Sequence, residues 1–198
     1  MKHRYLESRE VSPTRRELLM GSLLLPLLAS ANVRAAPANG RTLVAWFSRS
    51  GNTRVIAGQI ARSLQADRFE IRPARPYPDD YFETVEQARQ ERDSGFEPPL
   101  SSSVEGMDRY ETIYLGFPIW GMTAPPVIRS FLSGQELAGK TIVPFITHGG
   151  FGTGDSLEVV ASHAPQARLV EGLTMERPQE RETIERVTEW LDELDISP

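Results

Sequence analysis

The chain has 198 residues, of which 39% are hydrophobic, and a formal net charge of −5, which is typical of a globular protein with one domain. This charge does not indicate a nucleic-acid partner. The absence of cysteine excludes disulfides, zinc ribbons, thiol-based phosphatases and iron–sulfur clusters. The three histidines lack the spacing of a metal site, so no metal is expected.

Residues 1–36 have the layout of a secretory signal peptide. A basic start is followed by an apolar run, Leu18–Ala31, that is short for a membrane span, and small residues close the segment. Arg15-Arg16 stands immediately before the apolar run and is similar to the twin-arginine export signal. We expect cleavage between Ala35 and Ala38 and a periplasmic or otherwise extracytoplasmic location in a bacterium. The alternative is an uncleaved membrane anchor.

The mature chain that this cleavage predicts is distinctly acidic. Residues 1–36 carry six basic and three acidic side chains, so their removal would change the net charge from −5 to −8. The twin-arginine route carries folded proteins, often with a cofactor already bound, so the signal itself indicates a cofactor. No stable membrane span is expected in the mature chain.

The stretch from Leu43 to Leu64 predicts a strand, a tight loop and a helix. Leu43–Phe47 is a short apolar run of the kind found in buried strands. It gives way to the small and hydroxylated residues of Ser48–Thr53, after which apolar positions recur at helical spacing as far as Leu64. This order of elements predicts that the loop lies at the start of a helix.

A loop in this position can form an anion site. The free N–H groups of the first helical turn point into the loop, and the helix dipole favours negative charge there. Gly51 lets the backbone approach a ligand, and Ser48, Ser50 and Thr53 add hydroxyl donors. We therefore expect a phosphate in this loop. The alternative is that Ser50, Asn52 and Thr53 merely cap the helix.

The next part of the chain is more polar. Arg68–Pro73 alternates like a strand with one wet face, and three prolines then impose extended or turn structure. Tyr81–Arg92 is charged with sparse apolar positions and predicts a surface helix, while Ser94–Met107 reads as a loop. A solvated acidic turn, rather than a catalytic set, is expected from Asp79, Asp80 and Glu83.

Two further strands each end at a loop of unusual composition. Thr112–Phe117 is a continuous apolar run that predicts a central strand, and it ends at the aromatic loop Pro118–Met122. A helix is expected to open at the proline pair that follows. Lys140–Thr147 predicts the next strand, which gives way to the glycine-rich turn His148–Asp155.

The remaining segments complete an alternating pattern. Ser156–Ala164 predicts a helix, Ala167–Leu173 the last strand, and Glu180–Leu194 a closing amphipathic helix. Five strands alternating with helices predict an α/β fold with a parallel sheet covered on both faces. Ligands of such sheets bind at the carboxyl ends of the strands. The three loops there offer complementary chemistry: one suits a phosphate, one an aromatic face and one bare backbone amides.

Three motifs together resemble the flavodoxin-like family: Phe47–Thr53, Leu115–Gly121 and Phe145–Gly150. The resemblance covers Arg41–Leu194, so we expect a flavodoxin-like domain over residues 41–195 after the signal peptide. It implies a three-layer α/β/α sandwich with a five-stranded parallel sheet of order 2-1-3-4-5. It also implies FMN as the cofactor.

The resemblance assigns the FMN phosphate to the first loop and places Trp120 and the glycine turn on either side of the isoalloxazine. The cofactor-binding residues expected in this way are Ser48, Arg49, Ser50, Gly51, Asn52, Thr53, Pro118, Ile119, Trp120, Gly121, Thr147, His148, Gly149, Gly150 and Phe151. Two positions depart from the family pattern. Arg49 adds charge to the phosphate loop, and Gly121 stands where relatives often carry a second aromatic residue.

Other motifs are weaker. Gly134–Thr141 has the spacing of a nucleotide-binding P-loop, but it follows a helix and leads into a strand, so Lys140 is expected at the surface. The glycines of His148–Asp155 lack dinucleotide-fingerprint spacing. Ser48, His148 and Asp155 could form a hydrolytic triad, but Ser48 lacks the nucleophile elbow.

The function expected from this sequence is that of an exported FMN protein that moves electrons through the flavin ring. Its partner would be a redox protein or a small-molecule electron acceptor, with no nucleic acid involved, and no catalytic side chain is assigned. One alternative is an NAD(P)H-dependent quinone or small-molecule reductase on the same fold. Another is a non-redox module that binds a phosphorylated ligand, because fold alone does not decide function.

Overall fold

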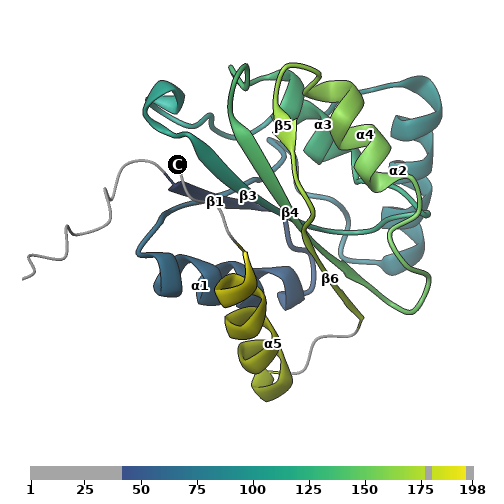
Figure 1. Cartoon of the computed structure of the whole chain (residues 1–198). Helices are drawn as coiled ribbons and strands as arrows, with labels where there is room; N and C mark the ends of the chain where they lie inside the picture. The colour runs from purple at the N-terminus through teal and green to yellow at the C-terminus, as the bar shows by residue number, and fades with distance from the viewer. Residues whose placement is uncertain (1–41, 177–179, 195–198) are drawn as a thin grey trace, which may run out of the picture. The chain divides into compact units, whose positions relative to one another are not determined.

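The computed structural model describes residues 42–176 and 180–194, so the signal peptide predicted over 1–36 lies outside the described residues. In the part that is described, strands and helices alternate along the chain (Figure 1). No helix among these described residues is long and apolar enough to cross a membrane.

The centre of the fold is a parallel sheet. The second strand lies on one side of the first, and the later strands follow on its other side. The strand order is β2-β1-β3-β4-β5. The strands are β1 (Thr42–Trp46), β2 (Asp67–Glu70), β3 (Thr112–Pro118), β4 (Thr141–His148) and β5 (Arg168–Leu169). This order confirms the predicted flavodoxin-like sheet. The direction of winding reverses between β1 and β3, which is where open α/β sheets bind ligands.

The last strand differs from the prediction, because two short strands take its place. β5 pairs with the start of β4, and β6 (Leu173–Glu176) pairs with its end. Pro144 lies between the two paired regions of β4 and has no N–H group to donate to the ladder. Gly172 passes so close that a Cβ atom there would lie 1.9 Å from the Pro144 carbonyl oxygen. The proline therefore divides the expected strand.

Helices cover both faces of the sheet and form the outer two layers (Figure 1). On one face α1 (Asn52–Leu64) packs against α5 (Glu180–Glu193). On the other, α3 (Pro126–Ser133) contacts both α2 (Tyr81–Ser94) and α4 (Ser156–His163). The predicted three-layer α/β/α arrangement is therefore confirmed.

Alternation along β1 divides its side chains between two cores. Leu43 and Ala45 belong to the core under α3, and Val44 and Trp46 to the core under α1 and α5. β3 follows the same rule. Its Tyr114 ring meets Trp190 of α5 edge-on, at 5.7 Å between ring centroids. Burial raises the pKa of Tyr114 to about 12.

One sequence prediction about the connection between α3 and β4 is wrong. Lys140 was expected at the surface, but its side chain is buried and its Nζ donates a hydrogen bond to the Tyr110 carbonyl at 2.6 Å. The amine can be buried because this carbonyl accepts a hydrogen bond from it. The segment does follow a helix and precede a strand, so the exclusion of a P-loop stands.

Candidate functional site

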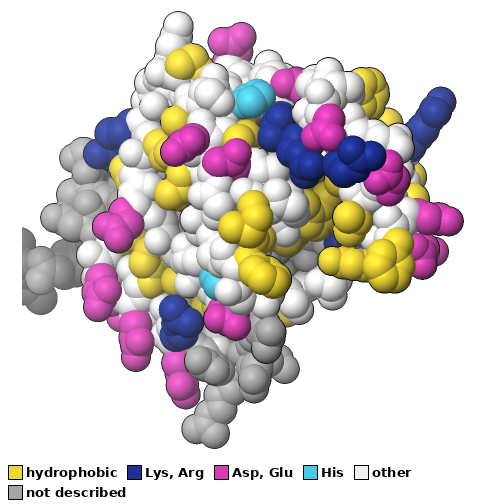
Figure 2. All heavy atoms as spheres, turned by 90° about the vertical axis from the view of Figure 1, so that its right-hand side faces the viewer, with side chains coloured by type: hydrophobic (Ala, Val, Ile, Leu, Met, Phe, Trp, Pro, Cys, Tyr) yellow, Lys and Arg dark blue, Asp and Glu magenta, His cyan; other side chains and the backbone are white. Residues whose placement is uncertain are grey.

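The three loops that leave β1, β3 and β4 lie together at the carboxyl edge of the sheet, on the right in Figure 1. Figure 2 shows the molecule from that side. A cavity of about 280 Å³ is lined by residues of all three loops and the strand ends beside them, namely Ser50, Asn52, Pro118, Ile119, Thr147, His148 and Gly149. Seven of the residues predicted to bind the cofactor therefore meet in one place.

The loop after β1 turns sharply into α1. Gly51 has φ 95°, a left-handed conformation that glycine adopts at little cost, and its N–H donates to Ser48 Oγ at 3.1 Å. The helix then starts at Asn52 with no side-chain hydrogen bond to its first turn. The alternative that Ser50, Asn52 and Thr53 cap the helix is therefore wrong. The N–H groups of the first turn are available to an anion.

Thr147 ties the three loops to one another. Its Oγ1 lies 3.0 Å from Thr53 Oγ1 in the first turn of α1, and both side chains are buried. Its carbonyl accepts a hydrogen bond from the N–H of Ile119 at 2.9 Å. The end of β4 thus holds both the start of α1 and the loop after β3 in place.

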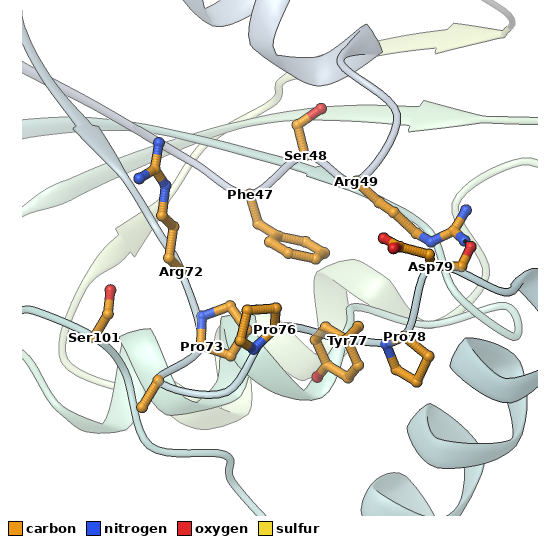
Figure 3. Close-up of a pocket in the computed structure, with 11 residues that line it drawn as sticks. Phe47, Ser48, Arg49, Arg72, Pro73, Pro76, Tyr77, Pro78, Asp79 and Ser101 are labelled. Atoms are coloured by element: carbon orange, nitrogen blue, oxygen red, sulfur yellow. Dashed lines mark hydrogen bonds between the residues drawn. The ribbon is translucent and has the colours of Figure 1, made fainter.

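Arg49 does not line this cavity, although the sequence placed it among the phosphate-binding residues. Its Nη2 donates to the Asp79 carbonyl at 2.6 Å, and its guanidinium lies 6.0 Å from the centroid of the Tyr81 ring. Figure 3 shows it reaching from the loop after β1 toward Asp79. Arg49 therefore ties the first loop to the segment before α2, where Asp80 Oδ1 accepts from the Glu83 N–H at 2.9 Å and caps that helix.

Trp120 belongs to an aromatic cluster that the sequence did not reveal. Its ring meets Phe47 edge-on at 5.2 Å and Tyr77 edge-on at 4.8 Å, and it is only partly exposed. Tyr77 in turn donates its hydroxyl to Glu91 of α2 at 2.8 Å. Burial, and then this hydrogen bond, raise the pKa of Tyr77. Trp120 thus contributes to the packing beneath the loop.

The glycine-rich turn after β4 is ordered by its own histidine. His148 Nδ1 accepts hydrogen bonds from the N–H groups of Gly150 at 3.1 Å and Gly152 at 3.3 Å. Nδ1 therefore acts as a hydrogen-bond acceptor in this turn. In a hydrolytic triad Nδ1 would instead donate to the acid, so the triad considered for Ser48, His148 and Asp155 is not formed.

The turn after β4 also rests on the loop after β3. The N–H of Asp155 donates to the Met122 carbonyl at 3.1 Å. A Cβ atom at Gly154 would lie 1.8 Å from that carbonyl oxygen, so only glycine allows this approach. Phe151, at the tip of the turn, is 76% exposed. The turn therefore brings His148 and Gly149 to the cavity and carries an exposed ring at its tip.

Two further hollows flank Arg49. One, of about 670 Å³, lies between the loop after β1 and the proline-rich segment 73–78, with Arg72 on its other side (Figure 3). The second, of about 430 Å³, lies between α2 and the loop after β3. The α2 residues of the second hollow could not be predicted from the sequence, because that helix has the pattern of an ordinary polar surface helix. The described residues contain no cluster of His, Asp or Glu suited to a metal ion.

The chain matches a known protein family and known structures. The model of the flavodoxin family matches residues 41–194. A candidate flavoprotein from Bacteroides eggerthii DSM 20697 has a crystal structure with a TM-score of 0.69 and 31% identity, covering 80% of this chain and 100% of that one. A second candidate flavoprotein, from Bacteroides uniformis ATCC 8492, has a crystal structure with a TM-score of 0.67 and 29% identity. The match covers 76% of this chain and 99% of that one.

A more distant likeness extends the comparison of folds. The flavoprotein of Lactobacillus acidophilus NCFM in complex with FMN gives a TM-score of 0.59 at 16% identity and covers 75% of this chain and 99% of that one. This likeness shows the fold alone. No curated protein matches the chain.

Proposed function

Because this chain belongs to the flavodoxin family, we propose that it binds FMN at the carboxyl edge of its sheet and transfers electrons through the flavin. The two relatives most informative for this proposal are the Bacteroides proteins, which are described as candidate flavoproteins. The distant Lactobacillus protein is described in complex with FMN.

The observation that carries the proposal is the uncapped first turn of α1 beside the 280 Å³ cavity. Ser48 Oγ is used within the loop, and the Thr53 hydroxyl is used by Thr147, so neither satisfies the helix amides. Such amides bind a phosphate through N–H donation and the helix dipole. Polar side chains line the cavity beside Pro118 and Ile119, and none of the described residues in its lining is a carboxylate that would repel the phosphate.

The other loops would hold the ring of the cofactor. Bound FMN supplies one- and two-electron chemistry, and the protein tunes it through contacts and nearby charge. Ile119 and His148 line the cavity next to the first turn of α1. The two amides held by His148 keep the turn after β4 in one shape, and Phe151 offers an exposed aromatic face beside it.

The visible spectrum of the purified protein tests the proposal directly. Two flavin absorption bands, from a cofactor that is released by denaturation and identified as FMN, are expected. Titration of the flavin-free protein should then show that riboflavin, which lacks the phosphate, binds at least a hundredfold more weakly than FMN. Equal affinities would remove the assignment of the phosphate to α1.

A variant of the first loop sharpens this test. Gly51→Val places a β-branched side chain at φ 95°, so the loop should change its path into α1. FMN affinity should fall by orders of magnitude while the sheet remains folded, as circular dichroism would show. Stopped-flow mixing of the holoprotein with NADH and NADPH distinguishes an electron carrier, which would react slowly, from a reductase.

We also propose that the protein is exported with residues 1–36 as a twin-arginine signal peptide. The support is the order of a basic start, Arg15-Arg16, an apolar run and small residues. A protein that acquires FMN before export would suit this route, because the route carries folded proteins.

A further inference from the structure

The hollow between α2 and the loop after β3, of about 430 Å³, adjoins the proposed flavin site. It shares three lining residues with the 280 Å³ cavity, namely Ser50, Pro118 and Ile119. A ligand in this hollow would therefore lie beside whatever occupies the cavity. We refer to the hollow as the α2 groove.

Much of the α2 groove is apolar and aromatic. Trp120 and Ile119 line it from the loop, while Tyr81, Val85 and Ala88 line it from one side of α2. Tyr81 is 62% exposed and Val85 is 47% exposed, and Phe82, which does not line the groove, is also exposed on this mostly polar helix. Figure 2 shows hydrophobic side chains gathered next to Lys and Arg side chains on this face. Exposed apolar side chains that converge on a hollow indicate a binding surface.

The absence of a side chain at Gly121 helps to shape the groove. Gly121 has φ 60°, and a Cβ atom there would lie 2.5 Å from Nη1 of Arg92. The guanidinium of Arg92 thus packs against the bare backbone of the loop. The guanidinium of Arg92 therefore occupies the space that a side chain at position 121 would fill.

Among the described residues that line the groove, the charged ones are all arginines: Arg49, Arg89 and Arg92. Arg89 is paired with Glu86 at 2.8 Å, and Arg92 Nε lies 3.4 Å from Asp93 Oδ1. Arg49 donates to a neutral carbonyl, and among the described residues no carboxylate lies within ion-pair distance of it. Guanidinium groups beside aromatic surface recognise a flat ligand that carries a carboxylate or similar anion.

We propose that the α2 groove binds a small planar aromatic anion beside the flavin. The inference deepens the proposed function, on which it rests, by naming the class of small molecule that this protein would hold next to its cofactor. The volume suits a ligand of two or three fused rings. Its flat face would lie against Trp120 and Tyr81, and its anionic group would face Arg92 and Arg49.

The experiment measures binding directly, by isothermal titration calorimetry of the full-length protein saturated with FMN. The probe is 2-naphthoate, and 2-naphthamide serves as a neutral ligand of the same size and shape. We expect one equivalent of naphthoate to bind at least tenfold more tightly than naphthamide. Equal binding of the two ligands would overturn the role of the arginines.

Three variants locate the site. Arg92→Gln should weaken naphthoate about tenfold and leave naphthamide within twofold, because it removes only the charge. Val85→Trp should weaken both ligands at least tenfold by filling the groove. Arg62→Gln, a matched change on α1 at an exposed position that does not line the groove, should change neither. Unchanged binding in both groove variants would overturn the proposal.

FMN affinity, measured for each variant by fluorescence quenching, separates this inference from the proposed function. A wild-type protein that binds FMN but not naphthoate overturns the inference alone. A protein that binds no FMN overturns the proposed function, and titration of the flavin-free protein then decides whether the groove takes the anion. Competition between naphthoate and FMN would show that the groove belongs to the cofactor, which also overturns the inference.

Discussion

Trp120 illustrates how one residue can serve both packing and binding. The resemblance to the flavodoxin-like family predicted that its ring flanks the flavin. The structure gives the indole two edge-on aromatic partners, Phe47 and Tyr77, so the packing role is present. Its flat face can still contribute to a site because it also lines the α2 groove.

Replacement of Trp120 by alanine should therefore affect stability as well as binding. Edge-on aromatic pairs are worth roughly 0.5–1.5 kcal/mol each beyond the area they bury. We expect Trp120→Ala to lower the free energy of unfolding of the flavin-free protein by about 2 kcal/mol. It should also weaken FMN about tenfold, because the loop that this ring supports carries Ile119 of the cavity. Chemical denaturation and FMN titration would measure these changes, with Trp120→Phe as the milder control. Unchanged stability would show that the edge-on contacts contribute nothing.

Tyr114 gives a pH dependence whose sign follows from its burial. The pKa of its phenol is raised from 10.0 to about 12 in the folded state, mainly by desolvation. Between these pH values the folded state keeps a proton that the unfolded state releases, so stability falls as pH rises. Each pKa unit corresponds to about 1.4 kcal/mol, which sets an upper limit of about 2.7 kcal/mol.

The Tyr114→Phe variant checks this sign. It keeps the ring and its edge-on contact with Trp190 but has no phenol to ionise. We expect wild type and variant to have similar unfolding midpoints in urea at pH 8 and the wild type to fall below the variant between pH 10 and pH 12. Parallel losses in both proteins would assign the alkaline instability to other tyrosines.

At the scale of elements, a helix or strand could be predicted from the sequence where the contacts that form it lie within its own segment. The strand, loop and helix from Leu43 to Leu64 follow from a pattern contained within the segment, and the structure has them as predicted. The division of the last strand could not be seen in that strand, because its cause is Pro144 on the neighbouring one. The α2 groove likewise depends on side chains from segments distant in sequence.

The site shows the same division. The composition of the loops was sufficient to predict that Ser50, Ile119 and His148 lie at one cavity. Side-chain directions were not predictable, since Arg49 turns toward a carbonyl thirty residues away. Lys140 was misplaced for a related reason: the carbonyl that compensates its burial belongs to Tyr110, thirty residues earlier in the chain.

The contact between the loops after β3 and β4 gives a prediction at this scale. Gly154→Ala would place Cβ 1.8 Å from the Met122 carbonyl oxygen, a backbone atom that cannot move without the loop. We expect a loss of roughly 2 kcal/mol in stability, from left-handed strain and the disrupted Asp155 hydrogen bond. FMN affinity should fall about tenfold, because the two loops would separate.

Gly152→Ala is the matched control for this variant. Gly152 also has a positive φ, of 70°, but an added Cβ atom would meet nothing within 4 Å. It should show the strain alone, roughly 1 kcal/mol, with FMN affinity nearly unchanged. Urea denaturation and FMN titration compare the two, and equal effects would show that the loop contact has no part in binding.

At the scale of the whole molecule, the proposed export by the twin-arginine route gives a testable prediction. Arg15→Lys combined with Arg16→Lys keeps the charge of the proposed signal peptide but removes the guanidinium pair. We expect this variant to remain in the cytoplasm, unprocessed and folded, when cell fractions are compared with wild type. Unchanged export would show that the pair is incidental and that the general secretory route is used.

The junction at Thr147 has a consequence for the motions of the site. Because Thr147 joins the start of α1 through its hydroxyl and the loop after β3 through its carbonyl, neither segment can open without disturbing the other. Segments coupled in this way exchange their amide hydrogens as one cooperative unit. The amides of Val55 and Ile119 should therefore share one opening free energy, and FMN should raise both by the same amount.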